Sequence, residues 1–374
     1  MLPIAFASLT ALLLSLLAGL TGQGVPAAVL HLAFAVGVLP LIFAAMLHFV
    51  PVLTRTGEQS ARIRRLPWLA QLAGIALVLA MQGILPYGWV SVVAAVDLIL
   101  AAILLGWIHK RMRATLGKPH PGCVWYVAAL ILLMLALIAI LGMRLFPDHW
   151  QAWRGFHLHL NTLGLVGMAA LGTLPVLLPT ALGLPDAKAA VWLKRHWLVM
   201  AAGVILLAGG AALYWPFSIA GGALLLLVAL GLLGQWLRCF GLGPLWRDGA
   251  ASLLSLALLG WCLMLLAGTT HALTDLDPGL ALWAWVVAFL MPLVTGALSQ
   301  LLPVWRWPGP KIPARDAMRA RLVAGGQWRG LLFLAAGVGF LLDFSGLAAL
   351  LVVAAMAMFL SNLLLAMRIP RSTR

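Results

Sequence analysis

The chain has 374 residues, of which 64% are hydrophobic and only 9% are charged, and its formal net charge is +15. A soluble domain carries about 25% charged residues, so this composition excludes a protein whose whole surface faces water. The positive charge alone would suit a nucleic-acid-binding protein, but the basic residues fall in the connections between apolar runs, where they orient membrane helices.

Apolar runs of about 20 residues span a bilayer as helices. In chain order, about twelve such runs cover residues 2–22, 26–53, 66–86, 88–108, 124–146, 155–183, 197–215, 217–238, 250–270, 279–304, 327–343 and 345–367. The first run has no basic segment before it and is long enough to remain as a helix, so no cleavable signal is expected. The sequence therefore predicts an all-α membrane protein.

The basic residues lie on one side of the predicted helices. With the N-terminus placed in the cytoplasm, the cytoplasmic connections and the C-terminal tail hold every Lys and Arg except Arg144 and Arg154. The positive-inside rule then puts both termini in the cytoplasm of a bacterial inner membrane. We expect this basic side to contact anionic membrane lipid, and we expect no nucleic-acid partner.

The ends of the second, sixth and tenth runs resemble one another. They read HFVPVLTRTG from His48, PVLLPTALG from Pro175 and SQLLPVWRWPG from Ser299, and their shared prolines are Pro51, Pro179 and Pro303, spaced by 128 and 124 residues. A small residue lies seven positions before each proline: Ala44, Gly172 and Gly296. Twenty positions before each proline lie His31, His159 and Trp283. The alternative to a repeat is that Leu-Pro endings are simply common in leucine-rich helices.

This repeat predicts three units of four helices, roughly residues 1–120, 121–245 and 246–374, within a single transmembrane domain. We expect a pseudo-threefold bundle with the second helix of each unit on the inside. The units share one orientation, because four helices return the chain to the same side, unlike the inverted repeats of many transporters.

Histidines near the periplasmic ends of these helices are the candidate ligands. They are His31, His157, His159 and His271. A neutral imidazole binds haem iron, copper or zinc, and haem is itself apolar. His157 and His159 are about 200° apart on a helix, so they cannot both point inward, and the repeat favours His159. The alternative is that these histidines bond backbone carbonyls or water at the membrane interface.

Three further residues carry hypotheses. Asn161 could orient an imidazole one turn away or bond across helices. Trp283 could wall a haem pocket in the third unit, which has no histidine at this position. Asp97 lies in the middle of a predicted span, where a carboxyl is costly and often functional. It could relay protons, or it could be a neutral group that hydrogen-bonds between helices.

Twelve helices in three units of four, with histidines near the periplasmic side, resemble the catalytic subunit of haem-copper oxidases. The segment HLHLNTLGLVG from His157 is similar to an HxHLNxLG stretch of divergent members of that superfamily, and the stretch HLAFAVG from His31 is similar to the NnrS family. This resemblance implies a b-type haem, and copper as a second metal, on His31 with His157 or His159. It also implies a role in nitric oxide tolerance or metal handling, with a small diatomic gas or a metal ion as the partner.

Two departures exclude a terminal oxidase. The tenth helix has no histidine for the haems, and the seventh, 197–215, has none for copper. The sequence does not decide whether the protein is an enzyme, although its absent oxidase ligands favour a non-enzymatic role. The alternative function is a cofactor-free transporter of a small solute or metal ion, and a third option is a structural or assembly subunit. Protein partners are not indicated.

Overall fold

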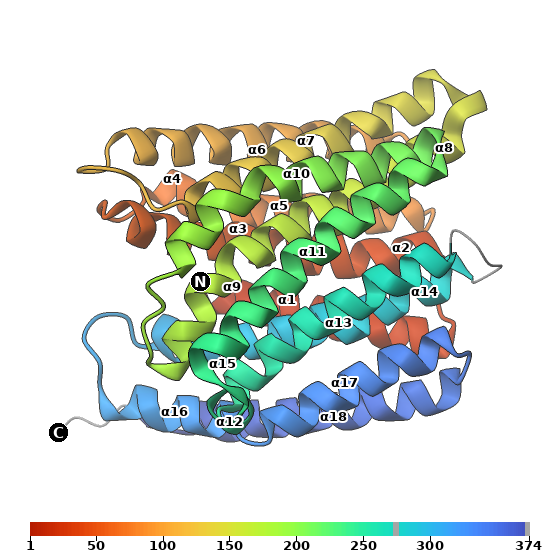
Figure 1. The fold of residues 1–374 in the computed structure, drawn as a ribbon. Helices are drawn as coiled ribbons and strands as arrows, with labels where there is room; N and C mark the ends of the chain where they lie inside the picture. The colour runs from red at the N-terminus through yellow and green to blue at the C-terminus, as the bar shows by residue number, and fades with distance from the viewer. Residues whose placement is uncertain (272–276, 371–374) are drawn as a thin grey trace. The chain divides into compact units, whose positions relative to one another are not determined.

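The computed structural model describes residues 1–271 and 277–370, except for the side chains of residues 270 and 271. These residues form helices joined by short connections, and none of the described residues forms a strand (Figure 1). Among the described residues, eleven helical runs are long and apolar enough to cross a bilayer. The predicted all-helical, multi-pass membrane class is therefore confirmed.

The first third of the chain contains four of these runs. Helix α1 (Leu2–Thr21) is followed by a continuous run of α2 (Pro26–His31), η1 (Leu32–Val38) and α3 (Leu39–Thr54). The short helix α4 (Ala61–Arg64) leads into α5 (Leu66–Met81), and α6 (Trp89–Arg113) completes the group. Prolines at the second position of α3 and α5 suit the helix start, where a backbone N–H is not needed.

The middle third repeats this order. Helix α7 (Gly122–Leu145) precedes η2 (Pro147–His149), α8 (Trp150–His159), η3 (Leu160–Gly167) and α9 (Met168–Leu182), which form one long run. Helices α10 (Ala189–Leu213) and α11 (Trp215–Phe240) follow. Helix α10 begins eight residues before the predicted start at residue 197, because the helix continues through the polar segment that carries Lys194 and Arg195.

The last third contains a second short linker helix and one shortened span. Its elements are α12 (Leu242–Arg247), α13 (Gly249–His271), α14 (Pro278–Trp285), η4 (Val286–Leu290), α15 (Met291–Arg306), α16 (Pro313–Val323), α17 (Gly326–Leu341) and α18 (Ser345–Met367). Helix α17 occupies the predicted run 327–343 but has only 16 residues. At 1.5 Å per residue it is about 24 Å long, which is less than the hydrocarbon thickness of about 30 Å. Asp343, with a φ of 59°, turns the chain into α18.

The contacts divide the chain into two units. Unit 1 comprises residues 1–172 and 193–221, and unit 2 comprises residues 173–192 and 222–374. The pseudo-threefold arrangement, the three sequence repeats and the cytoplasmic location of the termini stay predictions.

Each of the three long runs contains a π-helical segment at a corresponding place: η1, η3 and η4. The last α-helical residue before each segment is His31, His159 and Trp285, respectively. Counted from the π-helical segment, Trp285 therefore corresponds to the two histidines, whereas the proline spacing had indicated Trp283. The difference arises because η4, with 5 residues, is shorter than η1 with 7 and η3 with 8.

Prolines account for two of these segments. Pro40 and Pro292 are the second residues of α3 and α15, directly after η1 and η4. A proline has no N–H to donate four residues back and its ring pushes that carbonyl away, so the carbonyls of Val36 and Ala288 lose their α-helical partners. η3 has no proline at this place and instead contains Gly164 and Gly167.

Neighbouring helices of the same unit pack closely against these π-helical segments. Gln71 of α5 donates from its Nε2 to the oxygen of Val36 over 3.0 Å. Gly74 of α5 approaches the backbone of Ala35 so closely that an added Cβ would lie 2.5 Å from the carbonyl oxygen. In unit 2, Gly260 of α13 makes the same kind of approach to the carbonyl of Ala288. Small residues thus permit close helix contacts at these two π-helical segments.

These contacts predict that Gly74→Ala destabilises the protein, because either Ala35 or helix α5 must move. The expected cost is about 1–3 kcal/mol, the usual range for overpacking. The measurement is the midpoint of thermal unfolding of the full chain in detergent. The matched control is Gly106→Ala on α6, where an added Cβ meets no atom within 4 Å. Equal midpoints for the two variants would contradict the close contact.

Candidate functional site

Two histidines of unit 1 lie beside each other. His31 ends α2, His157 lies near the end of α8, and both side chains are half-buried. Their ring centroids are 6.4 Å apart and their planes are inclined by 23°. The structure therefore brings together residues that are far apart in the sequence and that lie in runs which the predicted repeat makes equivalent.

Each ring is held by a backbone carbonyl. His31 donates from Nδ1 to the oxygen of Ala27 over 2.7 Å, and His157 donates from Nδ1 to the oxygen of Ala136 in α7 over 2.8 Å. A carbonyl only accepts hydrogen bonds, so Nδ1 carries the proton in both rings and Nε2 keeps its lone pair. This is the tautomer in which an imidazole binds a metal through Nε2.

Asn161 fixes His157 from one turn along the same run. Its Nδ2 donates to the backbone oxygen of His157 over 2.8 Å and lies 3.4 Å from each ring nitrogen of that histidine. The side chain is half-buried. Asn161 thus acts on an imidazole one turn away, and the imidazole is that of His157.

His159 occupies a different environment from the one expected. The repeat favoured His159 as the inward residue, but the ring next to His31 is that of His157. His159 is half-buried and donates from Nδ1 to the oxygen of Gly155, four residues back, over 2.8 Å. His31 makes the same four-residue contact to Ala27, so the two histidines match in local conformation but not in neighbours.

The centroid separation of His31 and His157, whose rings are stacked, is also the spacing that two imidazoles would have across one metal. That spacing is about 6.4–6.6 Å, which is two metal–nitrogen bonds of ~2.0–2.1 Å plus two ring radii of ~1.2 Å. The observed 6.4 Å falls within this range. A haem iron needs only two protein ligands, because the porphyrin supplies four nitrogens. The described residues contain no group of three or more His, Cys, Asp or Glu side chains that could hold a metal ion.

The third long run carries an aromatic cluster in place of the histidines. In unit 2, the ring of Trp261 from α13 lies 6.2 Å from that of Trp285 and 4.7 Å from that of Phe289, and the latter two are 5.1 Å apart. Trp283 is half-buried, whereas Trp285 is buried. The predicted ligand His271 ends α13, and its side chain lies outside the described residues.

Asp97 is buried in the membrane part of α6. Its side chain is 3% exposed, and its Oδ1 has no hydrogen-bond partner among the described residues. The two predicted roles of Asp97, as a proton relay and as a neutral group that hydrogen-bonds between helices, stay predictions.

Sequence reasoning missed the proximity of His157 to His31, and it missed Gln71. The signal for Gln71 was available: Pro40 frees the carbonyl of Val36, and a glutamine near the start of the next apolar run is a suitable donor. No local signal pointed to His157, because its carbonyl partner Ala136 belongs to another helix.

The proximity of His31 and His157 predicts selective cross-linking. In a chain whose three native cysteines are replaced by serine, the pair His31→Cys and His157→Cys should be joined efficiently by a short bifunctional thiol reagent. The pair His31→Cys and His159→Cys is the matched comparison. Mass spectrometry of the digested protein reads the link, and preferential linkage of the second pair would overturn the assignment.

The chain was also compared with known proteins. Neither the models of protein families nor the curated proteins gave a match. The resemblance to NnrS proteins and haem-copper oxidases therefore stays an expectation based on topology and on two short segments. The function has to be argued from the residues of the site.

Proposed function

We propose that this chain is a haem-binding multi-pass protein of the bacterial inner membrane, with His31 and His157 as the ligands. Copper held by the same two imidazoles is the second form of this proposal. The observation that supports it best is the pair of rings 6.4 Å apart, each with Nδ1 committed to a backbone carbonyl. The resemblance to NnrS adds nitric oxide tolerance or metal handling as the physiological role.

The surroundings of the pair suit an apolar cofactor. The π-helical segments that follow His31 and His159 are almost wholly buried, and π-helical bulges often mark functional sites. His31 and His157 would hold the iron, and Asn161 would keep the ring of His157 in place. Bound haem would supply one-electron chemistry.

The membrane topology supports the same proposal. The eleven long runs together with the shorter α17 would make twelve crossings, which would bring both termini to one side of the membrane. The basic connections support placing that side in the cytoplasm of an inner membrane. His31 and His157 would then lie toward the periplasmic side, away from the basic connections.

The proposal predicts a visible absorption spectrum. The full chain, purified in detergent after haem-replete expression, should show a Soret band close to one haem per chain. His31→Ala and His157→Ala should each lower the haem content at least tenfold, because one ligand is lost. Asn161→Ala should weaken haem binding by about 10–100-fold, as for other residues that orient a ligand.

Two control variants test the assignment. His159→Ala removes the histidine of the neighbouring turn, and His48→Ala removes one on the same run about 25 Å away. Both should retain the band. Absence of a Soret band and of copper by metal analysis in the wild-type protein would sink the haem and copper proposal.

One observation favours a second function, the transport of a small solute or metal ion coupled to protons. Asp97 is buried in a membrane helix, and its Oδ1 has no hydrogen-bond partner among the described residues. Carboxyls in such places are costly and often carry protons. The helices interrupted by π-helical segments would also suit a transport path, since interrupted helices form the binding sites of many transporters.

This alternative predicts a proton flux that depends on Asp97. In proteoliposomes loaded with a pH-sensitive dye, a potassium diffusion potential should drive proton uptake by the wild-type chain. Asp97→Asn should reduce the rate at least tenfold, whereas Asp97→Glu should retain it, because only the carboxyl can exchange a proton. Equal rates for wild type and Asp97→Asn would remove Asp97 from any such path.

A further inference from the structure

At the end of unit 1 opposite to the histidine pair, the structure contains a pocket of about 520 Å³. It is formed by the last turn of α3, the connection between α6 and α7, the start of α7 and the first half of α10. Its basic lining residues are Arg55, Lys118 and Lys194, and its described lining includes no acidic residue. Its volume lies within the range of small-molecule sites, about 300–1,000 Å³.

Arg55, Lys118 and Lys194 form no ion pair with a carboxylate among the described residues. Ion pairs among the described residues involve Arg64, Lys311 and Arg319, and none involves Arg55, Lys118 or Lys194. Three like charges around one pocket repel one another. An anion in the pocket would relieve this repulsion.

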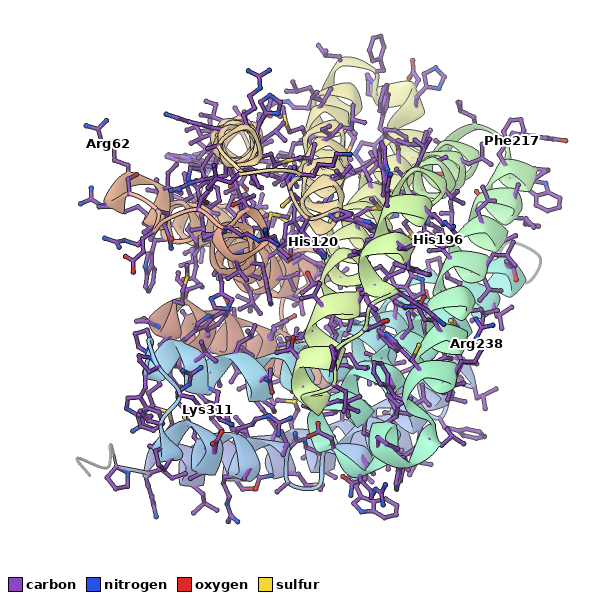
Figure 2. All side chains as sticks on the ribbon, turned by 60° about the vertical axis from the view of Figure 1, so that its left-hand side comes forward. Arg62, His120, His196, Phe217, Arg238 and Lys311 are labelled. Atoms are coloured by element: carbon purple, nitrogen blue, oxygen red, sulfur yellow. The ribbon has the colours of Figure 1, made fainter. Side chains whose placement is uncertain are left out.

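His120 adds a neutral donor to the same pocket (it is labelled in Figure 2). The backbone N–H of Gly122 donates to its Nδ1 over 3.2 Å, so Nδ1 is an acceptor and the proton is on Nε2. Burial lowers the pKa of His120, which keeps the ring neutral near pH 7. The ring can therefore donate from Nε2 to an anion without first being protonated.

The backbone at Arg55 indicates that its side chain is needed. Arg55 ends α3 with a φ of 52°, in the left-handed region. Glycine is the usual residue at such a helix end, because any side chain is strained there. A large charged residue at this position fits a role for its guanidinium at the mouth of the pocket.

The lining of the pocket also includes apolar side chains. Val52, Leu53, Val124 and Trp197 contribute to it. Tryptophan is characteristic of the headgroup level of a bilayer, and basic pockets between membrane helices bind anionic lipid headgroups.

We propose that this pocket binds a phosphate group, through Arg55, Lys118, Lys194 and the Nε2–H of His120. The group could belong to an anionic phospholipid or to a soluble phosphate compound, since the charged lining would recognise both. This inference is independent of the haem proposal, because it uses none of the same residues.

The first experiment measures lipid binding. The full chain in detergent is titrated with phosphatidylglycerol and with phosphatidylcholine, and bound lipid is counted by native mass spectrometry. The wild type should retain phosphatidylglycerol preferentially. The triple variant Arg55→Gln, Lys118→Gln, Lys194→Gln should bind it at least tenfold more weakly. Adding inorganic phosphate separates the sources: displacement of the lipid indicates a site for phosphate alone, and no displacement indicates a lipid site.

The matched control removes the same charge elsewhere on this side. The control is the triple variant Arg62→Gln, Lys110→Gln, Arg113→Gln. Its three residues are exposed and lie outside the pocket lining, so it should bind phosphatidylglycerol like wild type. An equal loss in the control would reduce the effect to general surface charge and overturn the proposal, as would undiminished binding by the pocket variant.

A single variant separates binding from folding. Arg55→Gly removes a pocket cation and relieves the left-handed backbone strain at the same position. It should weaken phosphatidylglycerol binding several-fold while leaving the unfolding temperature unchanged or higher. A fall in the unfolding temperature with unchanged binding would show that Arg55 serves the fold, and would contradict its place in the site.

Discussion

The fold depends on one constraint: a backbone carbonyl inside the bilayer needs a partner, because lipid offers none. In the π-helical segments η1 and η4, the regular α-helical hydrogen bonds are lost where Pro40 and Pro292 follow. Neighbouring helices pack closely against both segments. Gln71 donates to the oxygen of Val36, and Gly74 and Gly260 allow a neighbouring backbone to approach. Some of the close backbone approaches between helices therefore lie at the interrupted runs, where a glycine cannot be replaced by a larger residue without a shift of one helix.

The same constraint shapes the candidate site. The rings of His31 and His157 each donate a hydrogen bond from Nδ1 to a backbone carbonyl. In a soluble protein water could take that role, and the ring would turn freely. In the bilayer the carbonyl fixes both the tautomer and the orientation of each ring, so a polar group that folding must satisfy also leaves the lone pair on Nε2, as the proposed metal binding requires. His157 reaches a carbonyl of a different helix, which makes the site depend on the packing of α7 against the long run.

Composition and the length of apolar runs were sufficient to predict the class and most helices, since spanning a bilayer demands little more than 20 apolar residues. The proline repeat also singled out the three runs in which the structure has π-helical segments. It did not locate the neighbour of His31. His157 and His159 differ only by which neighbouring helix each one faces, and that choice is made by side-chain packing between segments distant in sequence. Helix α17 ends at Leu341, two residues before the predicted end at 343, because the left-handed turn at Asp343 is not an apolar-pattern signal.

The charge distribution has a consequence for chemistry as well as topology. His31 and Arg55 belong to the same helical run and are separated by 24 residues, or about 36 Å at 1.5 Å per residue. At that distance, and with an effective dielectric constant of about 20, two unit charges interact by about 0.5 kcal/mol. The cations around the proposed phosphate pocket therefore add little to the potential at the proposed metal site. Helix length thus allows the two proposed sites, one for a cation and one for an anion, to lie in one unit without opposing each other.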